Sequence, residues 1–161
     1  MHRDVHIVFP SQQMAVRRAL EQLARDLEPM GLSPEDHGTI ELVLAEALNN
    51  VVEHAYENDP GGTIDLRVAH SDKGLKFSIT DFGIPMPDGE LPLGREPDPN
   101  VEIEALPEGG FGWFLIRDLT HELIYAREHD QNVLTFRLAL TPTHVETSGE
   151  DAAPEQAAPG L

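Results

Sequence analysis

The start of the chain changes from a strand pattern to a helix pattern. Residues 5–9 (VHIVF) form a short apolar run that ends at Pro10, which predicts a first strand. Apolar residues at helical spacing follow. They predict a helix that begins after Ser11, its expected N-cap, and runs to about Glu28.

A second and longer helix is predicted after a short break at residues 29–31 (PMG). Ser33 is its expected N-cap, and Pro34 occupies the first helical position, where a missing N–H group costs nothing. The apolar spacing continues to about Tyr56, and residues 58–62 (NDPGG) end the helix.

The rest of the chain contains two predicted hairpins separated by an irregular stretch and a helix. Alternating apolar and polar positions predict that residues 63–69 pair with 75–80, and residues 122–127 with 132–140. An apolar segment at residues 111–119 predicts the helix. Residues 81–108 contain six of the chain's 13 prolines and have no periodicity. A connection of this length is typical of a lid or a binding loop.

This order of elements predicts an α+β fold. We expect a two-layer α/β sandwich with helices on one face of a mixed, mostly antiparallel sheet. The domain is expected to span residues 1–140, with a lid at about 85–109. Residues 141–161 contain four acidic residues and no Lys or Arg, which predicts a disordered acidic tail.

Composition narrows the possible partners. The chain has 161 residues, enough for a single domain with one core, and its 29 acidic against 11 basic residues give a net charge of -18. General binding to nucleic acid or to an anionic membrane is therefore not expected. A basic protein partner, or a phosphate held by a metal and backbone amides, is still a possible ligand.

The absence of cysteine excludes disulfides, thiolate zinc sites and a cysteine nucleophile. With no long apolar run, we expect a cytoplasmic protein.

The second predicted helix places Glu46 and Asn50 one turn apart on the same face. A solvated helix face is the ordinary explanation for an isolated pair of this kind. The alternative is that both side chains reach one ligand, because an amide oxygen suits Mg²⁺ and a carboxylate suits general-base chemistry. His54 lies one turn further on and is more often a packing residue than a catalyst.

Two glycine-containing segments are also candidates. Residues 81–85 (DFGIP) directly follow a strand, as an ordinary turn would. Alternatively, Asp81 accepts a hydrogen bond from an amino group while Gly83 lets the backbone pass close to a flat ring. Residues 108–113 (EGGFGW) open a helix. They are typical of a hinge, or of a site where backbone amides face an anion.

Taken together, the three segments resemble the GHKL (Bergerat-fold) superfamily of ATP-binding proteins, which includes gyrase and the histidine kinases. Residues 46–56 (EALNNVVEHAY) resemble its N box, residues 81–85 its first glycine box and residues 109–112 (GGFG) its second. The ending Asn-x-x-x-His-Ala-Tyr most resembles the anti-sigma-factor serine kinases. The resemblance covers about residues 5–140.

The resemblance implies a role for each matching residue. Asn50 would coordinate Mg²⁺ on the phosphates of ATP, and Glu46 would be the general base on an attacking serine hydroxyl. Asp81 would accept from the adenine amino group, with Gly83 allowing close approach. The glycines that would let the lid close over the phosphates are Gly109, Gly110 and Gly112.

The implied function is that of an ATP-dependent serine protein kinase and anti-sigma factor. It would phosphorylate a serine of an anti-anti-sigma (STAS-type) protein and sequester a sigma factor or similar regulator, as a homodimer. The alternative is a non-catalytic nucleotide-binding module for partner switching; a purely structural acidic protein is a third possibility.

The sequence departs from the family pattern at two places. Glu108 stands where some members have an arginine for the terminal phosphate, a role that Arg95 could take. Residues 132–136 (NVLTF) do not cleanly match the position of the threonine that the superfamily often has near adenine.

Overall fold

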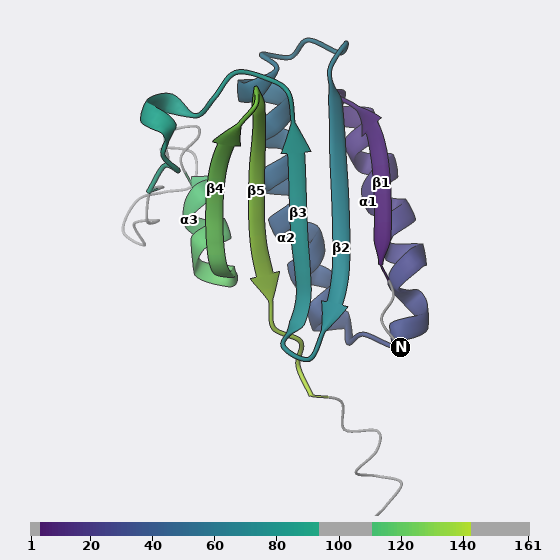
Figure 1. The fold of residues 1–161 in the computed structure, drawn as a ribbon. Helices are drawn as coiled ribbons and strands as arrows, with labels where there is room; N and C mark the ends of the chain where they lie inside the picture. The colour runs from purple at the N-terminus through teal and green to yellow at the C-terminus, as the bar shows by residue number, and fades with distance from the viewer. Residues whose placement is uncertain (1–3, 94–110, 143–161) are drawn as a thin grey trace, which may run out of the picture.

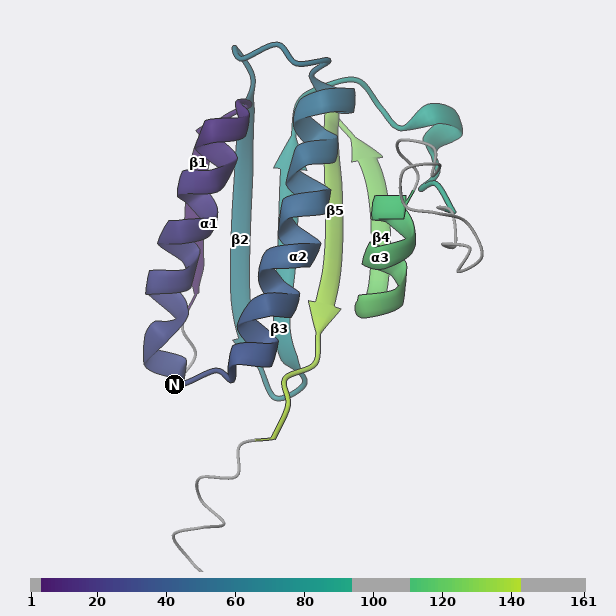
Figure 2. The same ribbon diagram turned by 180° about the vertical axis from the view of Figure 1, so that it is seen from behind.

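The computed structural model describes residues 4–93 and 111–142. It shows a five-stranded sheet in the order β1-β2-β3-β5-β4 with three helices on one face (Figures 1 and 2). The strands are β1 (Val5–Pro10), β2 (Thr63–Ser71), β3 (Gly74–Asp81), β4 (His121–Glu128) and β5 (Gln131–Leu138). The helices are α1 (Gln13–Leu27), α2 (Pro34–Asn50) and α3 (Phe111–Leu119). The predicted two-layer α+β fold is confirmed.

Every neighbouring pair of strands in the sheet is antiparallel, so the expectation of a mixed sheet was wrong. The reason lies in the connections. Two helices separate β1 from β2, and this even number of crossings returns the chain to the end of the sheet that it left. β3 and β4 run in the same direction, but β5 lies between them, so no parallel pair forms.

The core lies between the sheet and the helices. Inward-pointing side chains alternate along β2, β3 and β5, and those of Leu66, Phe77 and Phe136 are almost completely buried. Phe77 and Phe136 face each other across β3 and β5, with stacked rings 5.1 Å apart. Such cross-strand aromatic pairs stabilise a sheet beyond the area that they bury.

The two expected helix caps differ in outcome. The Ser33 Oγ accepts from the Asp36 N–H at 3.0 Å, so the predicted cap of α2 is confirmed. Ser11 does not cap α1, which begins two residues later. Its hydroxyl instead donates to the Asp59 carbonyl and accepts from the Gly62 N–H at 2.9 Å. Ser11 therefore ties the end of β1 to the loop that follows α2.

The C-terminal end of the described chain is anchored to α2. After β5, the Thr141 N–H and hydroxyl both donate to the buried Asp36 carboxylate, at 3.0 and 3.1 Å. This anchors the last described turn of the chain to the start of α2. Residues 143–161, and with them most of the predicted tail, lie outside the described residues.

Candidate functional site

The last turn of α2 brings the first and third motifs together. Glu46 and Asn50 are half-buried there, and the Asn50 Nδ2 donates to the Glu46 carbonyl at 2.9 Å. The Asn50 Oδ1 accepts no hydrogen bond from any described residue. Gly112, at the start of α3, faces both side chains: a Cβ atom there would lie 2.5 Å from the Glu46 Oε2 and 3.7 Å from the Asn50 Nδ2.

A π-helical turn joins the first motif to the second. α2 was expected to reach Tyr56, but it ends at Asn50 and continues as the wider turn η2 (Val51–Ala55), with the Tyr56 N–H bonded to the Val51 carbonyl. Isolated π turns are frequent at functional sites. Here the turn presents the Ala55 carbonyl to the Ile84 N–H, at 2.8 Å.

This contact also explains the glycine in the second motif. A Cβ atom on Gly83 would overlap the Ala55 carbonyl oxygen, so no side chain fits at this position. The sequence suggested that Gly83 makes room for a flat ligand. In the structure, the group that requires a glycine is the end of the π turn itself.

Asp81 is the buried carboxylate of the site. Only 4% of it is exposed, and its Oδ1 accepts from the Gly83 N–H at 2.9 Å and from the Asn132 Nδ2 at 2.8 Å. Its Oδ2 accepts no hydrogen bond from a described residue. Burial raises the pKa of the Asp81 carboxyl, while the hydrogen bonds from Asn132 and Gly83 and the charge of Arg127 act in the opposite direction. One fixed and one free oxygen suit recognition of an amino group.

Three side chains that the sequence analysis did not select hold the turn after Asp81. Asn132, directly opposite Asp81 in the sheet, also donates to the Ile84 carbonyl at 2.9 Å. The Tyr125 hydroxyl donates to the Asn132 Oδ1 and accepts from the Met86 N–H at 2.9 Å. Arg127 donates to the Gly83 carbonyl at 2.7 Å. Asn132 was detectable in principle, because it is a polar residue in phase with the apolar, inward-facing positions of its strand.

Tyr56 closes the site on the side of β2. Its hydroxyl donates to the Thr63 carbonyl at 2.6 Å and accepts from the Phe82 N–H at 2.7 Å. Burial is the main cause that raises the pKa of this phenol. The Tyr56 ring fills the space that a side chain on Gly62 would need. The Tyr at the end of the first motif therefore connects the end of the π turn to the start of β2 and to the residue that follows β3.

The structure thus assembles five of the seven predicted site residues at one end of the sheet: Glu46, Asn50, Asp81, Gly83 and Gly112. Gly109 and Gly110 lie outside the described residues, as do Arg95 and Glu108. His54 is exposed, and its closest charged neighbour is Glu53 at 4.0 Å. Within residues 4–93 and 111–142, no three His, Asp or Glu side chains are grouped so that they could hold a metal ion.

The electrostatics of the site fit a phosphate ligand that brings its own cation. Among the described site residues, Arg127 is the one arginine or lysine, and its guanidinium donates to the Gly83 carbonyl and to the Asn132 Oδ1. The Asn50 amide oxygen is a hard ligand of the kind that Mg²⁺ accepts while keeping most of its waters. The residues present therefore fit a magnesium ion held mainly by phosphate and water, with Asn50 as the protein ligand.

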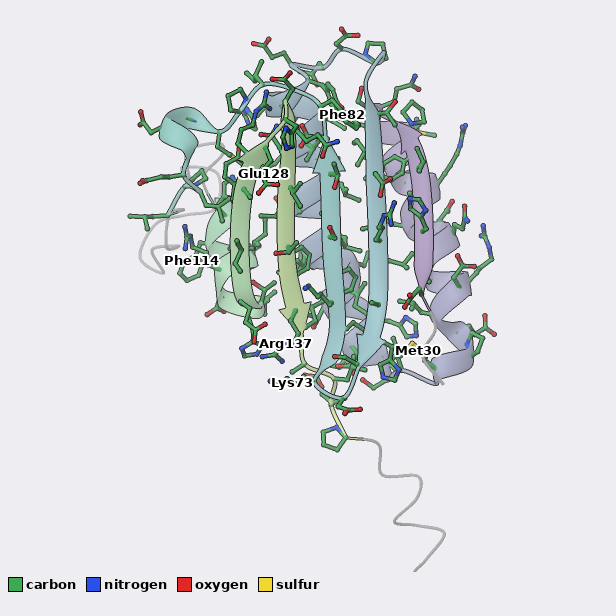
Figure 3. All side chains as sticks on the ribbon, viewed as in Figure 1. Met30, Lys73, Phe82, Phe114, Glu128 and Arg137 are labelled. Atoms are coloured by element: carbon green, nitrogen blue, oxygen red, sulfur yellow. The ribbon has the colours of Figure 1, made fainter. Side chains whose placement is uncertain are left out.

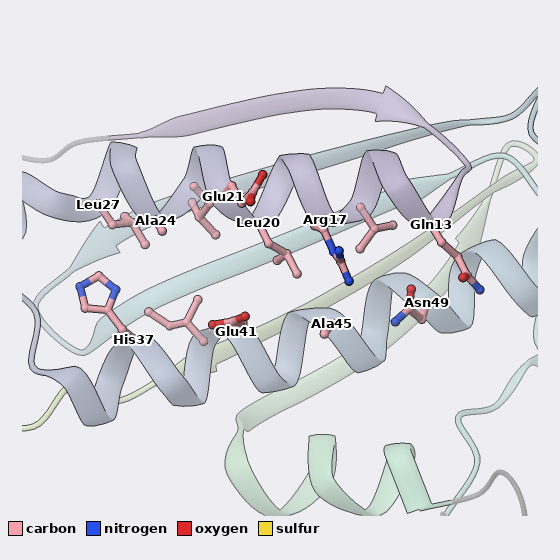
Figure 4. Close-up of a pocket in the computed structure, with 13 residues that line it drawn as sticks. Gln13, Arg17, Leu20, Glu21, Ala24, Leu27, His37, Glu41, Ala45 and Asn49 are labelled. Atoms are coloured by element: carbon pink, nitrogen blue, oxygen red, sulfur yellow. The ribbon is translucent and has the colours of Figure 1, made fainter.

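A separate groove of about 680 Å³ lies between α1 and α2 (Figure 4). Its floor is apolar, and Arg17, Glu21 and Glu41 are among the charged residues at its edges. It contains none of the predicted site residues, although Asn49 is the neighbour of Asn50. The candidate site residues therefore lie outside this groove.

Comparison with known proteins gives a consistent result. The family model described as "Histidine kinase-like ATPase domain" matches residues 9–138. The anti-sigma F factor of Geobacillus stearothermophilus is 24% identical over 136 residues, which cover 84% of this chain and 91% of that protein. The serine-protein kinase RsbW of Bacillus cereus is 29% identical over 106 residues, covering 65% of this chain and 66% of that protein.

A solved structure is similar in fold. The crystal structure of the RsbU and RsbW domains of a Mycobacterium tuberculosis protein matches with a TM-score of 0.60 and 20% identity, over 88% of this chain and 33% of that one. In the part of the chain that the structure describes, no helix has the length and apolar character needed to cross a membrane.

Proposed function

Because this chain belongs to the family of histidine kinase-like ATPase domains, we propose that it is an ATP-dependent serine protein kinase that acts as an anti-sigma factor. Family membership implies ATP binding. The observation that carries the kinase proposal is the meeting of Glu46, Asn50 and Gly112. There, a carboxylate that has no hydrogen-bond partner among the described residues lies beside the proposed magnesium ligand. Relatives named as anti-sigma factors and serine-protein kinases support the same role.

The proposal assigns a role to each described site residue. The free Asp81 Oδ2 accepts from the adenine amino group, and the hydrogen bonds from Asn132 and Gly83 hold the carboxylate in place. The Asn50 Oδ1 binds Mg²⁺, which neutralises phosphate charge when bound. Gly109 and Gly110, with Gly112, are proposed to carry the lid over the phosphates.

The transfer step uses Glu46 as general base. The Glu46 carboxylate takes the proton of a serine hydroxyl on the partner as the serine oxygen bonds to the terminal phosphorus of ATP. The bond from that phosphorus to the ADP oxygen breaks, and ADP leaves with the electron pair. Positioning and charge neutralisation supply most of the rate in such in-line transfers.

The proposed partners are an anti-anti-sigma protein of the STAS type, which carries the serine, and a sigma factor or similar regulator that the kinase sequesters in the cytoplasm. The net charge of -18 favours rapid encounter with a basic surface on either partner. A second candidate is a non-catalytic nucleotide-binding module that switches partners without phosphorylating them. Glu108, an acid at a position where some relatives place a cation, favours this second candidate.

Binding of magnesium nucleotide is tested by thermal unfolding. Mg-ATP or Mg-ADP at about 100 times its dissociation constant should stabilise the protein by about 2.7 kcal/mol, a shift of several degrees. We expect Asn50→Ala to lose this magnesium-dependent shift because the amide oxygen is removed. Asn49→Ala, next to it but on the side of the groove, should keep the shift. No shift in the wild type would contradict the proposed function.

The contact of Gly112 gives a sharper test of the transfer step. Gly112→Ala puts a Cβ atom 2.5 Å from the Glu46 Oε2, and the carboxylate has to move. We expect a loss of about 10- to 100-fold in phosphorylation rate, because displacement of a reacting group by ~1 Å can cost 100-fold. Folding stability should hardly change, since alanine suits a helix.

The matched control is Gly38→Ala in α2, where an added Cβ meets nothing within 4 Å. This variant should stabilise the fold by about 0.5–1 kcal/mol and leave the rate unchanged. Equal rates in the Gly112 and Gly38 variants would show that the Glu46 position is not critical.

A further inference from the structure

A row of three polar side chains crosses the sheet at the end that holds the site. Asp81 on β3 lies directly opposite Asn132 on β5, and Asn132 lies directly opposite Arg127 on β4. Figure 3 shows this end of the sheet, with labels on Phe82 and Glu128, the next residues along the chain from the two ends of the row. Arg127 and Asn132 lie outside the three sequence motifs.

The hydrogen bonds at the middle of the row determine which way the Asn132 amide points. Arg127 can only donate, and its guanidinium contacts the Asn132 Oδ1 at 3.2 Å. The Tyr125 hydroxyl accepts from the Met86 N–H at 2.9 Å, so its own hydrogen is donated to the same Oδ1. On the opposite side, the Ile84 carbonyl can only accept, and it bonds to the Asn132 Nδ2 at 2.9 Å. The NH₂ end of the amide must therefore face the carboxylate in the row.

This orientation determines the hydrogen-bonding character of the Asp81 carboxylate. Its Oδ1 accepts from two donors, the Asn132 Nδ2 at 2.8 Å and the Gly83 N–H at 2.9 Å. Asp81 and Asn132 are only 4% and 5% exposed, and hydrogen bonds are stronger in such a buried environment than in water. Two donors favour the ionised carboxylate. The Asp81 Oδ2, which accepts from no described residue, is therefore kept as an acceptor.

We propose that Tyr125 and Arg127 are positioning residues that set the nucleobase selectivity of the site. By holding the Asn132 amide, they keep Asp81 an acceptor, which suits the 6-amino group of adenine and opposes the 6-oxo group of hypoxanthine or guanine. If the amide were reversed end for end, its oxygen would face Asp81, and the two acceptors would repel unless a proton lay between them. This inference rests on the proposed function, because it concerns the same adenine site.

The first experiment measures base selectivity by titration calorimetry with Mg-ADP and Mg-IDP, whose purines carry an amino and an oxo group at the same carbon. We expect the wild type to prefer Mg-ADP by at least about 100-fold. Tyr125→Phe removes one donor to the Asn132 Oδ1 and leaves the Met86 N–H without its acceptor, so the amide is held less firmly. The preference should fall by at least about tenfold. Arg127→Met, which removes the other donor, should act in the same direction.

Two further variants separate positioning from a general loss of stability. In an Asn132→Ala background, Tyr125→Phe should change the preference no further, because the link to Asp81 has already been removed. Thr120→Val is the matched control, since it removes a half-buried hydroxyl that donates to the Ile116 carbonyl at 2.6 Å, just after α3. This variant should lower the unfolding temperature and keep the wild-type preference.

The second experiment needs no nucleotide and follows the pKa of Asp81 by NMR of its carboxyl carbon. Burial raises this pKa, and the hydrogen bond from Asn132 lowers it. The pKa should therefore rise in Tyr125→Phe and rise further in Asn132→Ala. The charge of Arg127 and the phenol of Tyr56 also act on Asp81, and neither group is altered in these two variants.

The two experiments distinguish failure of this inference from failure of the proposed function. An unchanged preference or an unchanged pKa of Asp81 in Tyr125→Phe overturns the inference and leaves the proposed function intact. An equal loss of preference in Thr120→Val also overturns it. If the wild type binds neither magnesium nucleotide, the proposed function is wrong and the inference fails with it.

Discussion

Glu46→Gln is expected to abolish serine phosphorylation while leaving nucleotide binding intact. The amide has the shape of the carboxylate and fits beside Gly112, but it cannot take the hydroxyl proton. Loss of a general base typically costs about 100- to 10,000-fold in rate. The assay is transfer of labelled phosphate from ATP to STAS-type proteins, each purified and offered one at a time. The same protein should show the wild-type thermal shift with Mg-ATP.

The control for this variant is Glu53→Gln, which makes the same chemical change on an exposed residue of η2. It should transfer phosphate at the wild-type rate. If Glu46→Gln retains substantial transfer, Glu46 is not the base. If the wild type binds nucleotide but labels no partner, the non-catalytic switching module becomes the better description.

Asp81→Asn should remove nucleotide binding and spare the fold. The asparagine oxygen can accept from Gly83 and Asn132 as the Asp81 Oδ1 does. Its NH₂ group then replaces the free oxygen and meets the adenine amino group donor to donor. We expect at least about 100-fold weaker binding, since a lost charge-assisted hydrogen bond and an unpaired buried donor each cost 1–3 kcal/mol. Titration calorimetry with Mg-ATP, using Asp72→Asn as an exposed control, measures the difference.

The pH dependence of stability provides an independent measurement on the same variant. Burial raises the pKa of Asp81 above its ordinary 3.8, so the folded protein keeps this proton to a higher pH than the unfolded chain does. The contribution of Asp81 to the free energy of unfolding is therefore full at low pH and is lost as pH rises from 3.8 through the raised pKa. Without ligand, Asp81→Asn should be at least as stable as the wild type at neutral pH, and should lack this decline.

Much of the fold could be predicted because its signals are local. Alternation in residues 63–69 and 75–80 located a hairpin, and the Ser33–Pro34 pair located the start of α2. The motifs predict that Glu46, Asn50 and Asp81 belong to one site, and the structure brings their segments to the same end of the sheet. The predictions that failed concern contacts with distant parts of the chain. The Ser11 hydroxyl bonds to the loop at Gly62 instead of capping its own helix.

The contacts around Asp81 show the same limit. Asn132 meets Asp81 because β5 inserts between β3 and β4, and a register of this kind cannot be read from one strand alone. The π turn is likewise invisible in the spacing of apolar residues. Its own hydrogen bond joins the Tyr56 N–H to the Val51 carbonyl, and the Ile84 N–H, almost thirty positions further along, bonds to the Ala55 carbonyl at its end.

The origin of the site in four separated parts of the chain has a consequence for folding. Glu46, Asp81, Gly112 and Asn132 come together only when α2, both hairpins and α3 are all in place. Each of these long-range closures has an entropic cost that no single hairpin can recover. ATP can therefore select only the completely folded form, and by mass action it suppresses every partly open form at once. Under the proposed function, a bound nucleotide therefore indicates that α2, α3 and both hairpins are folded around it.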